Sequence, residues 1–321
     1  SLVQTALSGM SSAGLGNSSP IIEEGGEGAT REPSNILYDT VETDASRRYK
    51  LWYGGTDNHL RMAHAATPSG PWTKYNSAAS VANDTEDAFV LILADNSYLM
   101  LAEDRASGAQ QNIKYLTSSD GLSWTDNGAI TLRDSGGTPK SPHNAQSPTI
   151  WVEGSTFYML YENYPNTPND VRLASSSDGL DWTDVQSGSV FDATIANWMN
   201  EDPGTTVPDD IRKLFGTYYL TYHTAGDNRG SGFATSTDRI NWTDAGELHC
   251  DDVTRLIPQS IQFVPDETND ITVEPVAVIM NGQETQDPDT FTTGLVYKLI
   301  CKDSQTLPSG WASGTGGTGG A

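Results

Sequence analysis

The sequence predicts an all-β protein, a five-bladed β-propeller of four-stranded antiparallel blades. Three observations support this prediction. A tryptophan-containing turn recurs five times, with 52, 58, 60 and 69 residues between successive tryptophans. The same succession of short strand-like runs surrounds each turn. We find no convincing amphipathic helix pattern, and 209–215 is expected to form a single helical turn at most.

The repeated turn has a common form in which a short polar turn leads to a tryptophan, followed in the four clear copies by a threonine. The four clear copies are Ser69–Lys74, Asp120–Asp126, Asp178–Asp184 and Asp238–Asp244, and the degenerate fifth is Pro308–Trp311. Self-similarity at a regular period of this length is typical of stacked supersecondary units. We therefore expect five units, and we expect Trp72, Trp124, Trp182 and Trp242 to be structural.

Each unit contains three recognisable strand runs, and a fourth strand is expected after each turn. The first runs are 33–38, 88–93, 148–152, 204–207 and 261–264. The second, more continuously apolar runs are 49–53, 98–101, 157–161, 218–222 and 276–280. The third runs are 60–65, 113–118, 171–176, 232–236 and 295–300. Strands that are apolar on both alternating faces suit blades covered on both sides.

The repeat also sets the domain boundaries. One propeller is expected over residues 31–311, with an N-terminal arm or attachment segment at 1–30 and a Gly-rich tail at 312–321. The expected blades are about 31–76, 84–128, 143–187, 199–246 and 254–311. The low-complexity ends would suit attachment to a larger assembly.

The charge excludes some partners. The chain has 42 acidic and 18 basic residues, a formal charge of -24, so a nucleic-acid partner and an anionic membrane surface are not expected. The longest apolar run, 88–94, is too short to span a bilayer. Asp outnumbers Glu 28 to 14, and Lys occurs seven times. Short hydrated carboxylates of this kind favour a halophilic source, the alternative being an ordinary acidic secreted protein.

Cysteines and the N-terminus are less informative. Cys250 and Cys301 would form one disulfide or remain as two buried thiols. No Lys or Arg precedes Arg31, so the basic region of a secretory signal is missing from this chain. We nevertheless expect an extracellular or surface-exposed protein, on a cell or a virion, whose signal was removed or whose export follows another route.

Polar residues stand just before each first run. They are Glu32, Asp87, Gln146, Asp202 and Gln259, spaced by 55, 59, 56 and 57 residues. Equivalent positions of five blades lie on a ring around the axis, so these side chains are expected to face one another at one mouth of the propeller. Gln259 has the weakest case and is equally well explained as structural.

The repeat resembles the five-bladed glycoside hydrolases, most closely family 43 and more distantly families 32 and 68. The segments that carry the resemblance are Tyr49–Gly55, Ser118–Trp124 and Ser176–Trp182. In family 43 an Asp in the first blade is the general base, an Asp in the second tunes pKa and orients substrate, and a Glu in the third is the general acid. The resemblance implies Glu32, within Arg31-Glu32-Pro33, as the base and Asp87 as the second carboxylate.

The third catalytic position departs from the family. Gln146 stands where the resemblance implies the general acid, although its surroundings in 146–150 and 157–162 match. A carboxamide binds a sugar by hydrogen bonds but cannot deliver a proton, as inverting hydrolysis requires. The acid would have to come from Glu162, Glu201 or Asp202. Glu103 and Glu162 follow second strands and are expected on either rim.

Further candidates for sugar contacts are Arg31, Gln146, Asp202, Glu162, His143 and Trp198. Trp198 lies in a predicted mouth loop and would stack on a sugar face, with loop packing as the alternative. His143 and His223 either contact ligand or are satisfied structural histidines. No metal-binding motif is present, although related propellers sometimes hold an axial Ca²⁺ and an acidic mouth would suit one.

Two functions are therefore expected from the sequence. The first is a carbohydrate-recognising, glycoside-hydrolase-like propeller with weak or lost hydrolysis, such as a surface or viral appendage that binds cell-surface glycans. The second is an active glycosidase of arabinofuranosidase, xylosidase or fructosidase type, with Glu32 as base and a relocated acid.

Overall fold

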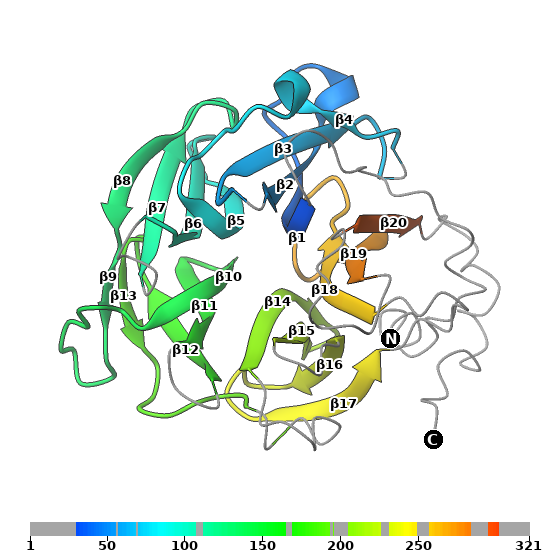
Figure 1. The fold of residues 1–321 in the computed structure, drawn as a ribbon. Coiled ribbons are helices and arrows are strands. Elements are labelled where there is room, and N and C mark those ends of the chain that lie inside the picture. Colours follow the sequence, from blue (N-terminus) through cyan, green and yellow to red (C-terminus); the bar gives the residue numbers. More distant parts are fainter. Residues whose placement is uncertain are drawn as a thin grey trace.

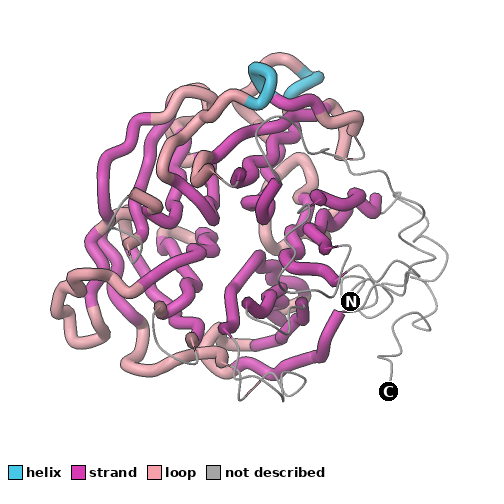
Figure 2. The backbone as a smooth tube through the Cα atoms, in the orientation of Figure 1, coloured by secondary structure: helices cyan, strands magenta, loops and turns pink. Residues whose placement is uncertain are grey.

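Strands arranged around a central axis make up most of the described chain (Figures 1 and 2). The computed structural model describes residues 30–55, 57–68, 70–106, 112–164, 169–192, 195, 205–225, 231–248, 257–283 and 295–301. In these residues the only helices are two short 3₁₀ segments, η1 (Ala45–Arg47) and η2 (Tyr75–Ala78). Neither is long enough to cross a membrane.

Four blades are complete antiparallel meanders. Blade I is β1 (Thr30–Tyr38), β2 (Tyr49–Gly55), β3 (Leu60–Ala65) and β4 (Thr73–Lys74). Blade II is β5 (Thr85–Ile92), β6 (Tyr98–Asp104), β7 (Ile113–Ser118) and β8 (Thr125–Ala129). Blade III is β10 (Ala145–Glu153), β11 (Thr156–Asn163), β12 (Asp170–Ser176) and β13 (Asp181–Asp184). Blade IV is β14 (Thr205–Leu214), β15 (Thr217–Ala225), β16 (Ser231–Ser236) and β17 (Trp242–Leu248).

A three-stranded sheet lies between blades IV and I, formed by β18 (Ile257–Val264), β19 (Ala277–Gln283) and β20 (Leu295–Cys301) (Figure 1). The prediction of an all-β propeller with four-stranded antiparallel blades is thus confirmed. The expected count of five such blades is not: four are complete, and this sheet has three strands among the described residues.

Two further details differ from the sequence-based expectation. Blade III gains a fifth strand, β9 (Thr131–Arg133), which pairs in parallel with β13. The segment 209–215, expected as a helical turn, instead lies mostly in β14. Its residues alternate between neighbouring blades, and Ile211 packs in the core beside Trp151. Because tertiary packing decided this segment, its weak local helical pattern was misleading.

The hydrophobic core is divided into clusters between adjacent blades. Trp52 and Met100 belong to the cluster between blades I and II, and Trp182 to that between II and III. Another cluster joins blades III and IV, and a fourth joins the three-stranded sheet to blade I. Trp52, Trp151 and Trp182 are at most 1% exposed. These clusters explain why the second strands are apolar on both faces.

The repeated turn is held by its aspartate. In blade III, Asp178 Oδ1 accepts hydrogen bonds from the backbone N–H groups of Leu180 (2.8 Å) and Asp181 (2.9 Å), and the Ser176 hydroxyl donates to the same oxygen (2.9 Å). These hydrogen bonds lower the pKa of Asp178. Trp182 closes the turn by donating from Nε1 to the carbonyl of Gly179 at 2.9 Å. The structural role expected for the turn tryptophan follows from this geometry.

Gly179→Ala is expected to destabilise the fold by about 1–2 kcal/mol. Gly179 has φ +78°, and an added Cβ would lie 3.0 Å from Cδ2 of Leu99 in blade II. The matched control is Gly188→Ala, where an added Cβ meets nothing within 4 Å. Urea denaturation of both variants measures the difference, and an equal loss in the two would show that neither the turn conformation nor the contact with Leu99 matters.

Each inner strand has a β-bulge near its start. The register shifts fall between Pro33 and Ile36, Glu86 and Phe89, Gln146 and Thr149, Pro208 and Asp210, and Pro258 and Ser260. A bulge re-aims a side chain and interrupts the ladder. The shared position of the five bulges therefore directs one short polar segment of every sheet toward the axis.

Polar side chains join the inner strands, which form no ladder with one another. Asn35 of β1 donates to the carbonyl of Val90 in β5 (2.8 Å) and accepts from its N–H (2.7 Å). Asp210 of β14 accepts from the N–H of Phe263 in β18 at 2.8 Å. Each of these side chains makes hydrogen bonds to the backbone of the adjacent inner strand, as a paired strand would. These bonds hold the bulged segments in a fixed arrangement around the axis.

Candidate functional site

A small cavity of about 30 Å³ lies on the axis where the bulges of the inner strands meet. Every inner strand contributes to its lining. The residues are Pro33–Asn35 of β1, Asp87–Phe89 of β5, Ser147–Thr149 of β10, Val207–Asp209 of β14 and Ser260 and Gln262 of β18, together with His223 of β15. A space of this size admits water or a single sugar hydroxyl, so a sugar ring would lie above it.

Asp87, one of the residues singled out in the sequence, lines this cavity. Its backbone is in the left-handed region, with φ 43°, within the bulge of β5. The hydroxyl of Ser147 in β10 donates to Asp87 Oδ2 at 2.9 Å. Ser147 also has positive φ, 47°. The two residues occupy equivalent bulge positions in neighbouring blades, and their hydrogen bond links these blades beside the axis.

This equivalence changes the expected alignment of blades II and III. In the ladders, Glu86 pairs with Glu103 and Gln146 pairs with Glu162. Gln146 is therefore the counterpart of Glu86, one residue before the bulge, and Ser147 is the counterpart of Asp87. Gln146 is buried, 8% exposed, and lies beside rather than in the lining of the cavity.

Glu162 is the penultimate residue of β11, the second strand of blade III, and lies near Asp87 on the same rim. Its side chain is 5% exposed and accepts a hydrogen bond from Asn169 Nδ2. The pKa of Glu162 is raised to about 7, chiefly by burial and also by the nearby charge of Asp87, whereas the Asn169 hydrogen bond and His223 act in the opposite direction. Glu162 is thus a carboxyl group that holds a proton near neutral pH.

Glu103 is the corresponding carboxyl of blade II. It is 3% exposed, and its pKa is raised well above the usual range by burial and by the charge of Asp87, with Glu86 and Glu162 adding to the effect. Arg105 opposes this shift, because its guanidinium lies 2.8 Å from carboxylate oxygens of both Glu103 and Glu86. The rim therefore concentrates carboxyl groups around one arginine.

Asp209 and His223 form a buried pair in blade IV. Nδ1 of His223 lies 2.6 Å from Asp209 Oδ1, and Asp209 Oδ2 accepts from the N–H of Ile261 at 3.2 Å. Burial raises the pKa of Asp209, while His223 opposes that shift. Sequence reasoning missed Asp209 because it assigned the fourth ring position to Asp202, seven residues earlier.

The remaining predicted site residues are placed as follows. His143 is 6% exposed, and its Nδ1 accepts from the N–H of Ile113 at 3.3 Å, which ties it to β7 outside the cavity lining. Burial lowers the pKa of His143 to about 4, so the ring is neutral. Arg31, Glu32 and Gln259 lie in β1 and β18, and their side chains are outside the described residues.

Several predictions concern residues beyond the described ranges. Trp198, Glu201 and Asp202 lie outside them, as do Cys250 and the side chain of Cys301. Within the described residues, no three His, Cys, Asp or Glu side chains are grouped so that they would hold a metal ion. The axial carboxyl groups face protein donors, as in the pairs Ser147–Asp87 and His223–Asp209.

Chemically, the rim combines a proton donor with hydrogen-bonding groups. Glu162 provides a neutral carboxyl, Asp87 a carboxyl beside a space for one water, and Gln146 a carboxamide in the ladder next to Glu162. Such a set can bind sugar hydroxyls as donors and acceptors. It also brings two carboxyl groups, those of Asp87 and Glu162, close enough for their charges to interact.

No protein-family model and no curated protein sequence matches the chain. Solved structures do. One comes from work on the GH130 family of mannoside phosphorylases, which contains glycoside hydrolases that target β-1,2 mannosidic linkages in Candida mannan. It is 12% identical in sequence to this chain, with a TM-score of 0.60, and the match covers 88% of each chain. A family 117 glycoside hydrolase from Zobellia galactanivorans is 12% identical with a TM-score of 0.55, covering 83% of each.

A third similar structure is an N-acetylgalactosamine deacetylase from F. plautii in complex with blood group B trisaccharide. It is 13% identical with a TM-score of 0.53, covering 88% of this chain and 91% of the other. At these identities the likeness shows the fold. The chain accordingly has the β-propeller fold of glycoside-hydrolase-like proteins.

Proposed function

We propose that the protein is a glycan-binding propeller whose recognition site is the rim around Asp87, Gln146 and Glu162. The observation that carries the proposal is the ladder pair Gln146–Glu162, a buried carboxamide beside a carboxyl whose pKa is about 7. At neutral pH this pair supplies hydrogen-bond donors as well as acceptors, which a rim of ionised carboxylates would lack. The propeller fold shared with carbohydrate-active proteins also supports a glycan-binding function.

The proposal includes finer features expected from the sequence. The three-stranded sheet is the fifth blade of a propeller most like glycoside hydrolase family 43, and Arg31, Glu32, Asp202, Trp198 and His143 belong to or support the binding rim. The protein acts outside the cell or on a surface, such as that of a virion, and its Asp-rich surface is suited to high salt. Its glycan partner is on a cell surface.

A second function, glycoside hydrolysis, is favoured by one specific observation. The raised pKa of Glu162 makes it a candidate for the missing general acid, since it would be partly protonated at neutral pH. Asp87 beside the water-sized cavity, or Glu32, would then act as the base. In this arrangement the acid comes from the second strand of blade III rather than from the inner strand.

The test is a glycan array followed by calorimetry and by a panel of aryl pentosides and oligosaccharides at low and high salt. Binding without turnover is expected for the wild-type protein. Asp87→Asn and Glu162→Gln are each expected to weaken binding at least about tenfold, because a hydrogen bond to a charged or buried group is lost. Asp181→Asn, which changes an exposed residue at the start of β13, is the matched control and should bind normally.

Each alternative outcome is decisive. Turnover that Glu162→Gln abolishes while binding persists would establish the glycosidase instead. Glycan binding that is unchanged in both rim variants would move the site elsewhere on the protein. The absence of both binding and turnover across the panel would overturn both functions.

A further inference from the structure

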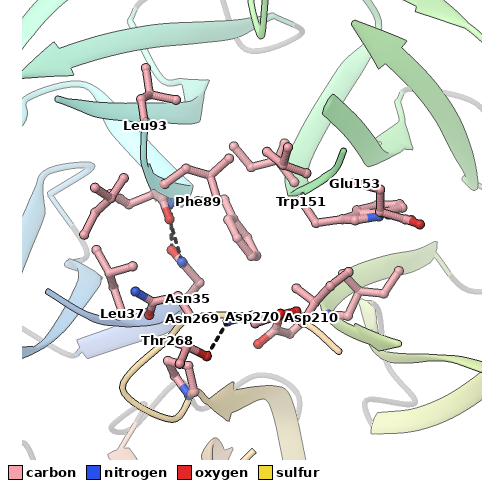
Figure 3. Close-up of a pocket in the computed structure, with 18 of the residues that line it drawn as sticks. Asn35, Leu37, Phe89, Leu93, Trp151, Glu153, Asp210, Thr268, Asn269 and Asp270 are labelled. Carbon is pink, nitrogen blue, oxygen red and sulfur yellow. Dashed lines mark hydrogen bonds between the residues drawn. The ribbon is translucent and has the colours of Figure 1, made fainter. Parts of the chain in front are cut away.

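A second cavity, of about 710 Å³, lies at the other end of the propeller axis, where the inner strands end. The walls come from the later halves of β1, β5, β10 and β14, and the connection 265–272 after β18 closes one side (Figure 3). Only Asn35 and Phe89 line both this cavity and the small one at the bulges. Its volume is within the range of sites that bind small molecules.

Much of the wall is apolar. The aliphatic and aromatic residues that face one another across it include Leu37, Phe89, Leu91, Leu93, Ile150 and Ile211. Figure 3 shows Phe89, Leu93 and Trp151 on one side of the space and Thr268, Asn269 and Asp270 on the other. An apolar body of a ligand would therefore be buried against β5 and β10.

The carboxylates around the cavity already have protein donors. Asp210 accepts from the backbone N–H groups of Ile211 (2.7 Å) and Phe263 (2.8 Å). Glu153 accepts from Trp151 Nε1 (2.8 Å) and Lys213 Nζ (2.6 Å). Asp270 accepts from the N–H and hydroxyl of Thr272, both at 2.8 Å. These groups have little remaining capacity to hold a cationic ligand.

Arg212 is different. Its side chain lines the same cavity and is buried, with the residue 5% exposed, and its Nε atom has no hydrogen-bond partner among the described residues. The guanidinium lies over the ring of Phe263, 5.7 Å from its centroid. The negative charges of Asp210, Asp266 and Asp270 attract it, yet Nε has no acceptor among the described residues. A buried cation without an acceptor is costly, and an anionic ligand would remove that cost.

We propose that this cavity binds a small monocarboxylic acid with an apolar body, its carboxylate on Arg212 and its hydrocarbon along Leu91, Leu93 and Ile150. A guanidinium matches a carboxylate geometrically and binds it through two hydrogen bonds. A single negative charge is preferred over a phosphate, because three carboxylates surround the site and repel a second charge. The site is separate from the glycan rim and does not depend on the function proposed for it.

The test compares 2-naphthoate with 2-naphthalenemethanol, which has the same ring and no charge, by titration calorimetry on the full chain. The wild-type protein is expected to prefer the carboxylate at least about tenfold. Arg212→Met keeps the volume and is expected to abolish this preference. Arg133→Met, which removes an arginine exposed on β9, is the control and should retain it.

A further variant tests whether the ligand binds inside this cavity. Leu91→Trp fills part of the cavity and is expected to weaken naphthoate binding about tenfold while glycan binding at the rim is unchanged. Equal affinity of the wild type for the two compounds would overturn the proposal, and this result needs no variant to fold. Failure of 2-naphthoate to bind at about 1 mM, or a carboxylate preference that survives Arg212→Met, would overturn it as well.

Discussion

Lys50→Met is expected to lower the free energy of unfolding by about 3–5 kcal/mol. Lys50 is 1% exposed, and its Nζ lies 2.5 Å from Oδ2 of Asp39, which is fully buried. Tyr98 of blade II donates its hydroxyl to the same carboxylate at 2.8 Å. Removal of the ammonium group leaves the charge of Asp39 buried with neutral donors only. Urea denaturation at neutral pH measures the loss.

The control for this prediction is an exposed ion pair. Arg133 lies 3.0 Å from Asp181, but the two side chains are 33% and 51% exposed. Arg133→Met should therefore cost less than about 1 kcal/mol. A loss in Lys50→Met no greater than that of Arg133→Met would mean that Asp39 does not depend on its ion pair. The double variant Lys50→Met/Asp39→Asn is expected to recover part of the stability, because no charge then remains buried.

The fold could be predicted because its signals are local and repeated. Asp178 and Asp238 hold their turns with the same hydrogen bonds to the backbone, so similar sequences mark similar positions in successive blades. The apolar second strands follow from burial between blades, as the 0% exposure of Leu101 and Leu160 illustrates. Such signals need only a few consecutive residues to be recognised.

The candidate site was harder to predict because it depends on bulges. A bulge adds one residue, and a shift of one residue exchanges the side chain that faces the axis for its neighbour. For that reason Gln146 was aligned with Asp87, whereas the structure aligns Ser147 with Asp87. One signal was present: a proline lies at or beside the bulge in four sheets, at Pro33, Pro148, Pro208 and Pro258.

That proline signal would also have located Asp209. Asp209 directly follows Pro208 within the bulge of β14, and this position places its carboxylate against His223. The pairing with His223 itself could not be read from the sequence, because it depends on how β14 and β15 are registered. The position of Asp209 on the rim follows from the residues beside it in the sequence. Its buried partner, His223, follows from how the strands pack in the folded propeller.

Glu162→Gln is expected to change how stability depends on pH. In the folded protein the pKa of Glu162 is about 7, against 4.5 for the free side chain. Between these values the folded state retains a proton that the unfolded chain releases, so stability decreases as pH rises from 4.5 to 7. The difference corresponds to at most about 3 kcal/mol. A glutamine is neutral throughout and should lack this decrease.

The measurement is urea denaturation of both proteins from pH 5 to pH 8. Near pH 5 the two should be similarly stable, and at pH 8 the glutamine variant should be the more stable by about 1–3 kcal/mol. The buried Asp210, whose pKa is raised to about 6, decreases stability in the same direction in both proteins and cancels in the comparison. A stability difference that is constant from pH 5 to pH 8 would contradict the prediction.

This pH dependence separates a structural role of Glu162 from a functional one. A carboxyl placed for stability would be ionised and paired, as Asp178 is in its turn, and its pKa would be lowered. Burial of Glu162 beside Asp87 instead destabilises the fold above pH 7, a cost typical of groups positioned for binding or proton transfer. If Glu162→Gln gains stability at pH 8 while glycan binding or turnover is lost, the same carboxyl accounts for both effects.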